Sequence, residues 1–126
     1  MTQTIYPILR CRDPRAAMDW LERTLGFERD AVHEGDDGSV AHAELSFRGA
    51  TIMLGSAEGV DREAGEIGAS LTYIAVDEVD SVYERARDAG AEITMEPTDQ
   101  DYGSRDFAVR DPERNVWSFG TYRPAG

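Results

Sequence analysis

The sequence predicts an α+β fold made of two successive βαβββ modules, because one order of elements occurs twice. Residues 5–54 and 70–119 each begin with an apolar strand, continue with a helix and a glycine, and end in further strands. Three landmarks recur with an offset of 64, 64 and 65 positions: the aspartate before each helix (Asp13, Asp77), the glycine after it (Gly26, Gly90) and the last strand (50–54, 115–119). Such agreement predicts a true internal repeat.

In the first module, residues 5–11 are mainly apolar and predict a strand. Asp13 supplies a helix N-cap and Pro14 suits the first helical position. Apolar residues then recur at helical spacing until Gly26, which is typical of a helix end. Further strands are expected at 27–32, 40–47 and 50–54, the first two joined through an Asp37-Gly38 hairpin signal.

The second module follows the same order. A strand at 71–76 precedes a helix that we expect Asp77 to cap and Gly90 to end. Strands are then expected at 91–95, 104–110 and 116–122, separated by a polar loop at 97–103 and a tight turn at 111–115. The organisation is one domain over residues 1–126, with module 1 at about 4–55, a linker at about 56–69 and module 2 at about 70–122.

Composition restricts the partners. The net charge of −12 disfavours nucleic acid and anionic lipid. No apolar run approaches the ~18 residues that a membrane helix needs, and the first residues lack a signal-peptide pattern. The single cysteine, Cys11, permits no internal disulfide, suits a reducing cytoplasm, and is better explained as a small buried apolar side chain than as a reactive thiol.

Each predicted sheet has one face covered by its helix, and its other face needs a packing partner or a ligand to cover it. We expect the open faces of the two modules to form a curved mixed-sheet cavity, lined by alternate residues of eight strands.

The run YGSRDFAVRDPERNVWSF, residues 102–119, is the most specific part of the chain. It resembles the pattern G-x-R-x-F-x-x-x-D-P-x-G-N-x-x-x-F of the bleomycin-resistance-like branch of the vicinal oxygen chelate superfamily, which also includes glyoxalase I, and the resemblance extends over about residues 4–122. One departure is Arg114, which stands where the family usually has glycine. Asn115 is expected to take the positive φ there instead.

Metal-dependent members of this family place His or Glu at four equivalent strand positions. Carried over to this chain, those positions are Tyr6, Met53, Leu71 and Ser118. These side chains do not make a site for zinc, iron, manganese or magnesium, and a shift of one residue brings in no better donors. We therefore expect no metal and no cofactor.

The resemblance and strand alternation together predict the cavity lining. If the four positions face inward, so do Ile8, Arg10, Thr51 and Tyr73, while Trp117, Phe119, Ile52, Leu54, Ile74 and Val76 face the helices. Phe107 and Val109 are taken as the third-strand equivalents of His42 and Glu44. The predicted ligand-binding residues are Tyr6, His42, Glu44, Met53, Leu71, Tyr73, Tyr102, Arg105, Phe107 and Ser118.

Several interpretations stay open at this point. His42 and Glu44 share a face and are an acid–base pair, ligand anchors or a solvated rim. Arg105 is a ligand clamp or a structural salt bridge. The cavity itself is a ligand pocket or a filled core.

The resemblance implies a metal-independent protein that sequesters an aromatic or cationic drug-like molecule, as in antibiotic resistance, and a homodimer whose cavities form where modules of two chains meet. The alternative is an enzyme related to the glyoxalase lyases, isomerases or dioxygenases that acts without a metal through His42, Glu44 or a tyrosine.

Overall fold

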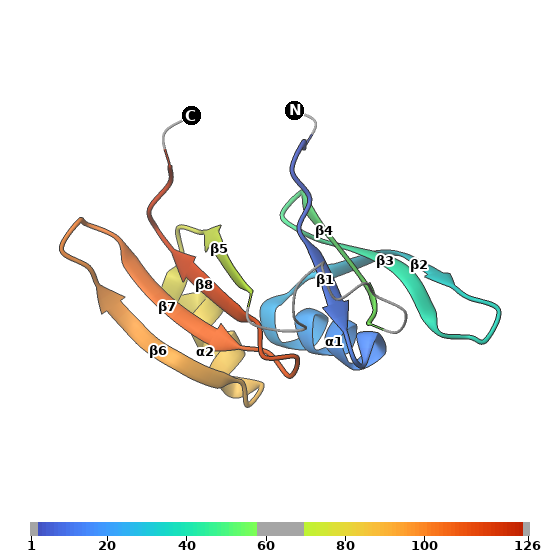
Figure 1. Ribbon diagram of the computed structural model, residues 1–126. Coiled ribbons are helices and arrows are strands. Elements are labelled where there is room, and N and C mark those ends of the chain that lie inside the picture. Colours follow the sequence, from blue (N-terminus) through green and yellow to red (C-terminus); the bar gives the residue numbers. More distant parts are fainter. Residues whose placement is uncertain (1–2, 58–69, 125–126) are drawn as a thin grey trace. The chain divides into compact units, whose positions relative to one another are not determined.

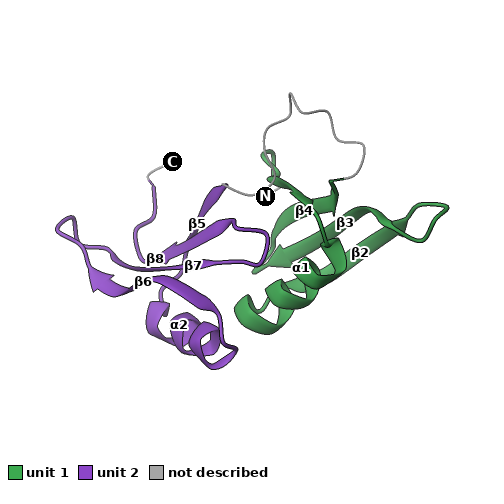
Figure 2. Cartoon of the chain, turned by 60° about the horizontal axis from the view of Figure 1, so that its bottom comes forward, with its two compact units in different colours: residues 1–68 green, residues 69–126 purple. Residues whose placement is uncertain are grey.

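The computed structural model describes residues 3–57 and 70–124 and confirms the α+β fold built from a repeated module. The chain forms two compact units, residues 1–68 and 69–126 (Figure 2). Each unit holds a four-stranded mixed sheet and helical structure on one face (Figure 1). Most of the predicted linker, residues 58–69, lies outside the described residues.

Unit 1 has the strand order β1-β4-β3-β2, with β1 parallel to β4 and the other pairs antiparallel. Its elements are β1 (Ile8–Cys11), α1 (Pro14–Trp20), the π-helical turn η1 (Leu21–Leu25), β2 (Glu28–Glu34), β3 (Val40–Phe47) and β4 (Ala50–Ser56).

The helix of unit 1 begins and ends as its sequence predicts. The Asp13 carboxylate accepts a hydrogen bond from the Ala16 N–H (3.1 Å), and Pro14 opens α1. The helical run ends at Gly26, whose φ of 83° is available to glycine without strain. Between helix and sheet lies the core of the unit: Leu9, Cys11, Met18, Leu21, Leu25, Leu45 and Leu54 are all buried.

Unit 2 repeats this topology with the order β5-β8-β7-β6, and β5 is again parallel to its neighbour β8. Its elements are β5 (Leu71–Ala75), α2 (Val79–Asp88), β6 (Glu92–Asp99), β7 (Arg105–Arg110) and β8 (Val116–Gly120).

Residues Val79, Val82 and Ala86 of α2 are buried on the helix-covered face of the sheet. On that same face Phe107 and Phe119 stack in nearly parallel planes, 5.2 Å between ring centroids, and Trp117 is buried. The predicted core positions Trp117, Phe119, Ile52, Leu54 and Val76 are therefore confirmed as buried, whereas Ile74 is only half-buried.

Two predictions about the bounds of elements in unit 2 are wrong. Asp77 does not cap α2: the N-cap is Glu78, without a side-chain hydrogen bond, and Asp77 instead lies 3.5 Å from the Arg123 guanidinium. The polar loop expected at 97–103 begins later, because β6 continues through Pro97 to Asp99. An edge strand tolerates proline, which lacks the donor that a central strand requires, and the pairing with β7 is irregular between Met95 and Thr98.

Neither helix of the described residues has the length and apolar character needed to cross a membrane.

The turn between β7 and β8 is organised by Asp111, which is almost fully buried. Its Oδ1 accepts hydrogen bonds from the N–H groups of Glu113 (2.8 Å) and Asn115 (2.9 Å), and its Oδ2 accepts one from Trp117 Nε1 (2.9 Å). The positive φ falls on Arg114, at 72°, so the expectation that Asn115 would take it is wrong. Asn115 is instead held by the Asp111 carboxylate and accepts from the Ser70 hydroxyl (2.8 Å).

Replacing Arg114 with glycine is expected to stabilise the protein by about 0.5–1 kcal/mol, because a non-glycine residue in the left-handed region carries a steric cost that glycine avoids. Arg114 is exposed, so little packing is lost. Urea denaturation of the parent and R114G measures the difference. Arg12→Gly, at an exposed position outside the positive-φ region, serves as a control and should not stabilise; equal stabilisation by both variants would contradict the argument from backbone strain.

Candidate functional site

The face of each sheet opposite its helix is the candidate functional surface. Every large hydrophobic side chain that is exposed among the described residues belongs to such a face or to the segment adjoining it: Ile5, Tyr6, Ile8, Leu71, Tyr73, Tyr102 and Tyr122. For Ile8 of β1 and for Leu71 and Tyr73 of β5, strand alternation explains the exposure, since successive residues of a strand point to opposite faces of the sheet.

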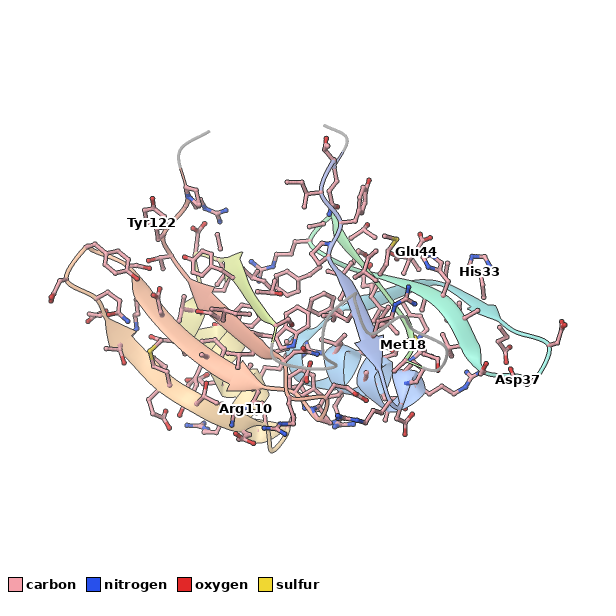
Figure 3. All side chains as sticks on the ribbon, in the orientation of Figure 1. Met18, His33, Asp37, Glu44, Arg110 and Tyr122 are labelled. Carbon is pink, nitrogen blue, oxygen red and sulfur yellow. The ribbon has the colours of Figure 1, made fainter. Side chains whose placement is uncertain are left out.

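On unit 1, the open face is defined by the row Ile8, Met53 and Glu44, which are neighbours on β1, β4 and β3. Glu44 Oε2 lies 2.9 Å from His42 Nε2, and the His42 ring stacks on His33 with 5.7 Å between centroids. Figure 3 shows Glu44 and His33 on the side of the sheet away from Met18 of α1. The side chains of His42 and Glu44 are about two-fifths exposed (39% and 40%), so they are accessible to solvent and are not core residues.

On unit 2, the corresponding row is Tyr73, Ser118 and Ala108 of β5, β8 and β7. The next pair along, Gly120 and Asp106, carries a polar group that the sequence did not single out. Asp106 Oδ2 accepts a hydrogen bond from the Tyr102 hydroxyl (3.0 Å), and its Oδ1 accepts one from the Ser104 hydroxyl. We call Asp106, its two hydroxyl donors and the neighbouring tyrosines the Asp106 cluster: Tyr73, Tyr102, Ser104, Asp106 and Tyr122.

The Asp106 cluster is tightly built. The Tyr73 hydroxyl donates to the Tyr122 carbonyl oxygen (2.6 Å), and the rings of Tyr102 and Tyr122 meet edge to face at 6.1 Å. Asp106 and Tyr73 both lie over Gly120, where an added Cβ would stand 2.1 Å from Asp106 Oδ1 and 2.6 Å from the Tyr73 hydroxyl. Only glycine fits beneath these two groups.

The tyrosines of the cluster are electrostatically coupled to the carboxylate. The hydrogen bond to Asp106 raises the pKa of Tyr102. Partial burial raises the pKa of Tyr73, and the nearby Asp106 charge acts in the same direction. Both phenols therefore stay protonated over the ordinary pH range and act as neutral donors.

Three of the residues expected on the open face of β7 lie on the opposite face. Phe107 and Val109 are fully buried, and the Tyr83 ring of α2 meets Phe107 edge to face at 5.6 Å. Arg105 lies on the same face as Phe107 and forms ion pairs with Asp80 of α2 (2.9 Å) and Asp99 (3.1 Å), which raise its pKa. Arg105 thus forms the salt bridges that the structural interpretation expects, and Phe107 is a core residue, contrary to the expectation that it lines the open face.

The error has a simple origin in the hairpins. Two residues separate the paired Phe47 and Ala50, whereas three separate Asp111 from Asn115, whose backbones are hydrogen-bonded. The offset between modules is thus 64 before this turn and 65 after it. The prediction used the larger offset for β7 and so matched His42 with Phe107 and Glu44 with Val109. This is one residue too far along the strand, and a shift of one residue exchanges the two faces. The smaller offset matches His42 with Asp106 and Glu44 with Ala108, and would have found the cluster.

The other predicted site residues occupy the expected faces. Tyr6 adjoins β1 two residues before Ile8, Met53 pairs with Ile8, and Tyr73 pairs with Ser118. Leu71 stands on β5 at the same face as Tyr73, and Tyr102 is in the Asp106 cluster.

The four positions that the resemblance assigns to metal ligands do not suit a metal here. Tyr6 and Met53 in unit 1, and Leu71 and Ser118 in unit 2, offer a phenol, a thioether, an alkyl group and a hydroxyl, and no imidazole or carboxylate. Such donors do not match the preferences of zinc, iron, manganese or magnesium. Within residues 3–57 and 70–124, no group of three His, Cys, Asp or Glu side chains is placed to hold a metal ion.

Comparison with known proteins agrees with this architecture. A family model described as Glyoxalase/Bleomycin resistance protein/Dioxygenase superfamily matches residues 4–119. The chain therefore belongs to this superfamily. An uncharacterized protein of Mycobacterium bovis is 30% identical over 127 residues, which span 92% of this chain and 81% of that protein. A Mycobacterium tuberculosis relative is also 30% identical over 127 residues, spanning 92% of this chain and 72% of its own length.

Solved structures show the same fold. TioX from Micromonospora sp. ML1 is 28% identical, with a TM-score of 0.85 over 97% of this chain and 100% of its own. TnmS3, described as an antibiotic binding protein from Streptomyces sp. CB03234, is 20% identical, with a TM-score of 0.74 over 94% of this chain and 96% of its own.

Proposed function

We propose that this protein binds a small, partly aromatic molecule on the open faces of its sheets, without a metal. The observation that carries the proposal is the set of large apolar and aromatic side chains left uncovered there, including Ile8 (56% exposed), Leu71 (72%) and Tyr102 (65%). Water contact with such surface is unfavourable, and gathered apolar side chains beside a few polar groups are the usual composition of a small-molecule site. Membership of a superfamily that includes an antibiotic binding protein is consistent with a drug-like ligand.

The proposed contacts follow the open faces. Tyr6, Ile8 and Met53 supply apolar surface in unit 1, with His42 and Glu44 as polar anchors. Leu71, Tyr73, Tyr102 and Ser118 do so in unit 2. Apolar contact is expected to supply most of the affinity, at about 2.5 kcal/mol for each 100 Å² removed from water before ordering costs.

The test is a thermal-shift screen of aromatic compounds with and without a chelator, followed by substitution. Ile8→Ser and Leu71→Ser should each weaken the hits that contact their unit by about 1–2 kcal/mol, because each removes an apolar contact. Both residues are exposed, so neither variant should unfold. Ala16→Ser on the exposed surface of α1 is the matched control. Unchanged affinity in both variants would exclude the open faces, and hits abolished by the chelator would exclude metal-independent binding.

A second candidate function rests on the His42–Glu44 contact, since a carboxylate that orients an imidazole is a common acid–base arrangement. In this case the protein would be a metal-independent enzyme, and a hit from the screen would be converted to product by the parent chain. His42→Ala should then stop turnover even at concentrations that saturate the variant with the compound. Hits that are bound and recovered unchanged would reject this candidate.

We also propose that the chain works as a homodimer. Modules of roughly 50 residues bury limited surface on their own, and the exposed apolar side chains of each unit supply surface for association. Sedimentation at micromolar concentration is expected to give twice the chain mass. A species of 13.9 kDa would contradict the proposal. A cytoplasmic location, suggested by the single cysteine, stays a prediction.

A further inference from the structure

Asp106 is a buried carboxylate without a charged partner among the described residues. It is 6% exposed, and within residues 3–57 and 70–124 its carboxylate accepts hydrogen bonds only from hydroxyl groups, those of Tyr102 and Ser104. Other carboxylates of unit 2 do have cationic partners: Asp80 and Asp99 both pair with Arg105, and Glu92 pairs with Arg110. Removing a carboxylate from water is costly, and neutral donors offset only part of the cost that a cation would offset.

The groups around this carboxylate present electron-rich surfaces. The hydroxyl hydrogens of Tyr102 and Ser104 point to Asp106, and that of Tyr73 points to the Tyr122 carbonyl. What remains for a ligand is the carboxylate, phenol oxygens and ring faces. The guanidinium of Arg123, whose charge acts on Tyr73, is paired with Asp77 at 3.5 Å. Tyr73, Tyr102 and Tyr122 are 38%, 65% and 51% exposed, so these faces are accessible. Aromatic faces and a carboxylate both attract cations and repel anions.

We propose that the Asp106 cluster binds the substituted ammonium group of an organic cation, with Asp106 as its counter-ion and the three tyrosine rings as its walls. This inference rests on the proposed function and names the chemistry of its ligand. A bare divalent ion is a poorer occupant, because it needs several converging oxygen ligands and here one carboxylate stands alone. A bulky organic cation, weakly hydrated, gains from contact with rings as well as from charge.

The proposal is specific to unit 2. The position that matches Asp106 in unit 1 is His42, and the carboxylate beside it, Glu44, already has the imidazole at 2.9 Å. Glu44 is also more exposed and therefore better solvated than Asp106. Charge complementarity thus favours the Asp106 cluster over the His42–Glu44 pair as the cation site.

The experiment titrates the full-length protein with three probes of similar size and different charge: benzyltrimethylammonium, benzyl alcohol and benzenesulfonate. Amide chemical shifts, followed at constant ionic strength, report both affinity and location. Benzyltrimethylammonium should saturably shift the amides of Tyr73, Tyr102, Asp106 and Tyr122. The alcohol and the sulfonate should bind there at least tenfold more weakly.

Asp106→Asn should weaken binding of the cation at least tenfold, while Asp101→Asn should change it less than twofold. Asp101 is exposed and adjoins Tyr102 in sequence, so this control removes the same charge without touching the cluster. Tyr102→Leu provides a second variant at an exposed position, which should fold normally and weaken the cation several-fold by removing one ring. Thermal unfolding of each variant verifies its fold.

Two results would overturn the inference while leaving the proposed function intact: equal binding of benzyl alcohol and the cation at this cluster, or cation-induced shifts confined to His42 and Glu44. Equal loss of affinity in D106N and D101N would show a general effect of net charge and would also overturn it. If the wider screen finds binders on the open faces but this cation does not shift the cluster, the inference fails alone. If no compound binds the open faces, the proposed function fails as well.

Discussion

Replacing Phe107 with alanine is expected to destabilise the protein by about 3–5 kcal/mol, which is typical when a buried aromatic side chain is removed from a core. Phe107 is fully buried, stacks on Phe119 and receives the edge of the Tyr83 ring from α2. The substitution leaves a cavity between helix and sheet that these neighbours can fill only in part. A loss of this size is a large fraction of the ~5–15 kcal/mol that stabilises an ordinary domain.

Urea denaturation of F107A, with the midpoint and slope both fitted, measures this loss. Phe107→Leu is the graded control, since it keeps an apolar side chain and should lose about 1–1.5 kcal/mol. Tyr102→Ala, at a largely exposed ring, should lose less than F107A. If F107A has the stability of the parent and binds ligand more weakly, Phe107 lies on the open face and the core assignment is wrong.

The topology was predictable because its signals are local and repeated. Asp13 followed by Pro14 begins α1, and Gly26 ends the helical run, as each residue type suggests. Such signals depend on a few neighbouring residues, and in unit 1 the tertiary contacts leave them in place. The repeat then transferred the same order to the second module, where Gly90 has a φ of 82° and follows α2.

The faces of β7 were not predictable by the same means, because a face depends on strand register. One additional residue in the turn after Arg110 is enough to exchange Phe107 for Asp106 on the open side. The alternation within β7 gives little help, because Asp106, Phe107, Ala108 and Val109 are all buried although alternate residues lie on opposite faces of the strand. The family motif at residues 102–119 includes Asp106, but matching the motif does not show which face of β7 this residue occupies.

Other differences arise where tertiary contacts override local preference. Arg114 holds the positive φ because the Asp111 carboxylate fixes the backbone on both sides of it. Pro97 stays within β6 because that strand lies at the edge of its sheet, where a missing donor is tolerated. Neither sheet position nor the partner of a carboxylate can be deduced from residue spacing alone.

Replacing Asp111 with alanine is expected to lower the free energy of unfolding by about 3 kcal/mol. Its carboxylate accepts hydrogen bonds from the backbone N–H groups of Glu113 and Asn115 and from the indole of Trp117, which is 1% exposed. Hydrogen bonds to a charged group each contribute about 1.5–3 kcal/mol, and a buried donor that loses its acceptor carries a desolvation penalty. Denaturation of D111A by urea gives the value.

Asp111→Asn should fall between the parent and D111A. An asparagine keeps one carbonyl oxygen for the backbone donors, but its NH₂ group cannot accept from the Trp117 N–H. A double-mutant cycle with Trp117→Phe isolates that contact, because phenylalanine has no N–H to leave unpaired. The losses in unfolding free energy caused by Asp111→Asn and Trp117→Phe should be less than additive by about 1 kcal/mol or more. Strict additivity would mean that the Trp117 contact contributes little, and that the turn holds its shape through the two backbone hydrogen bonds to Asp111 alone.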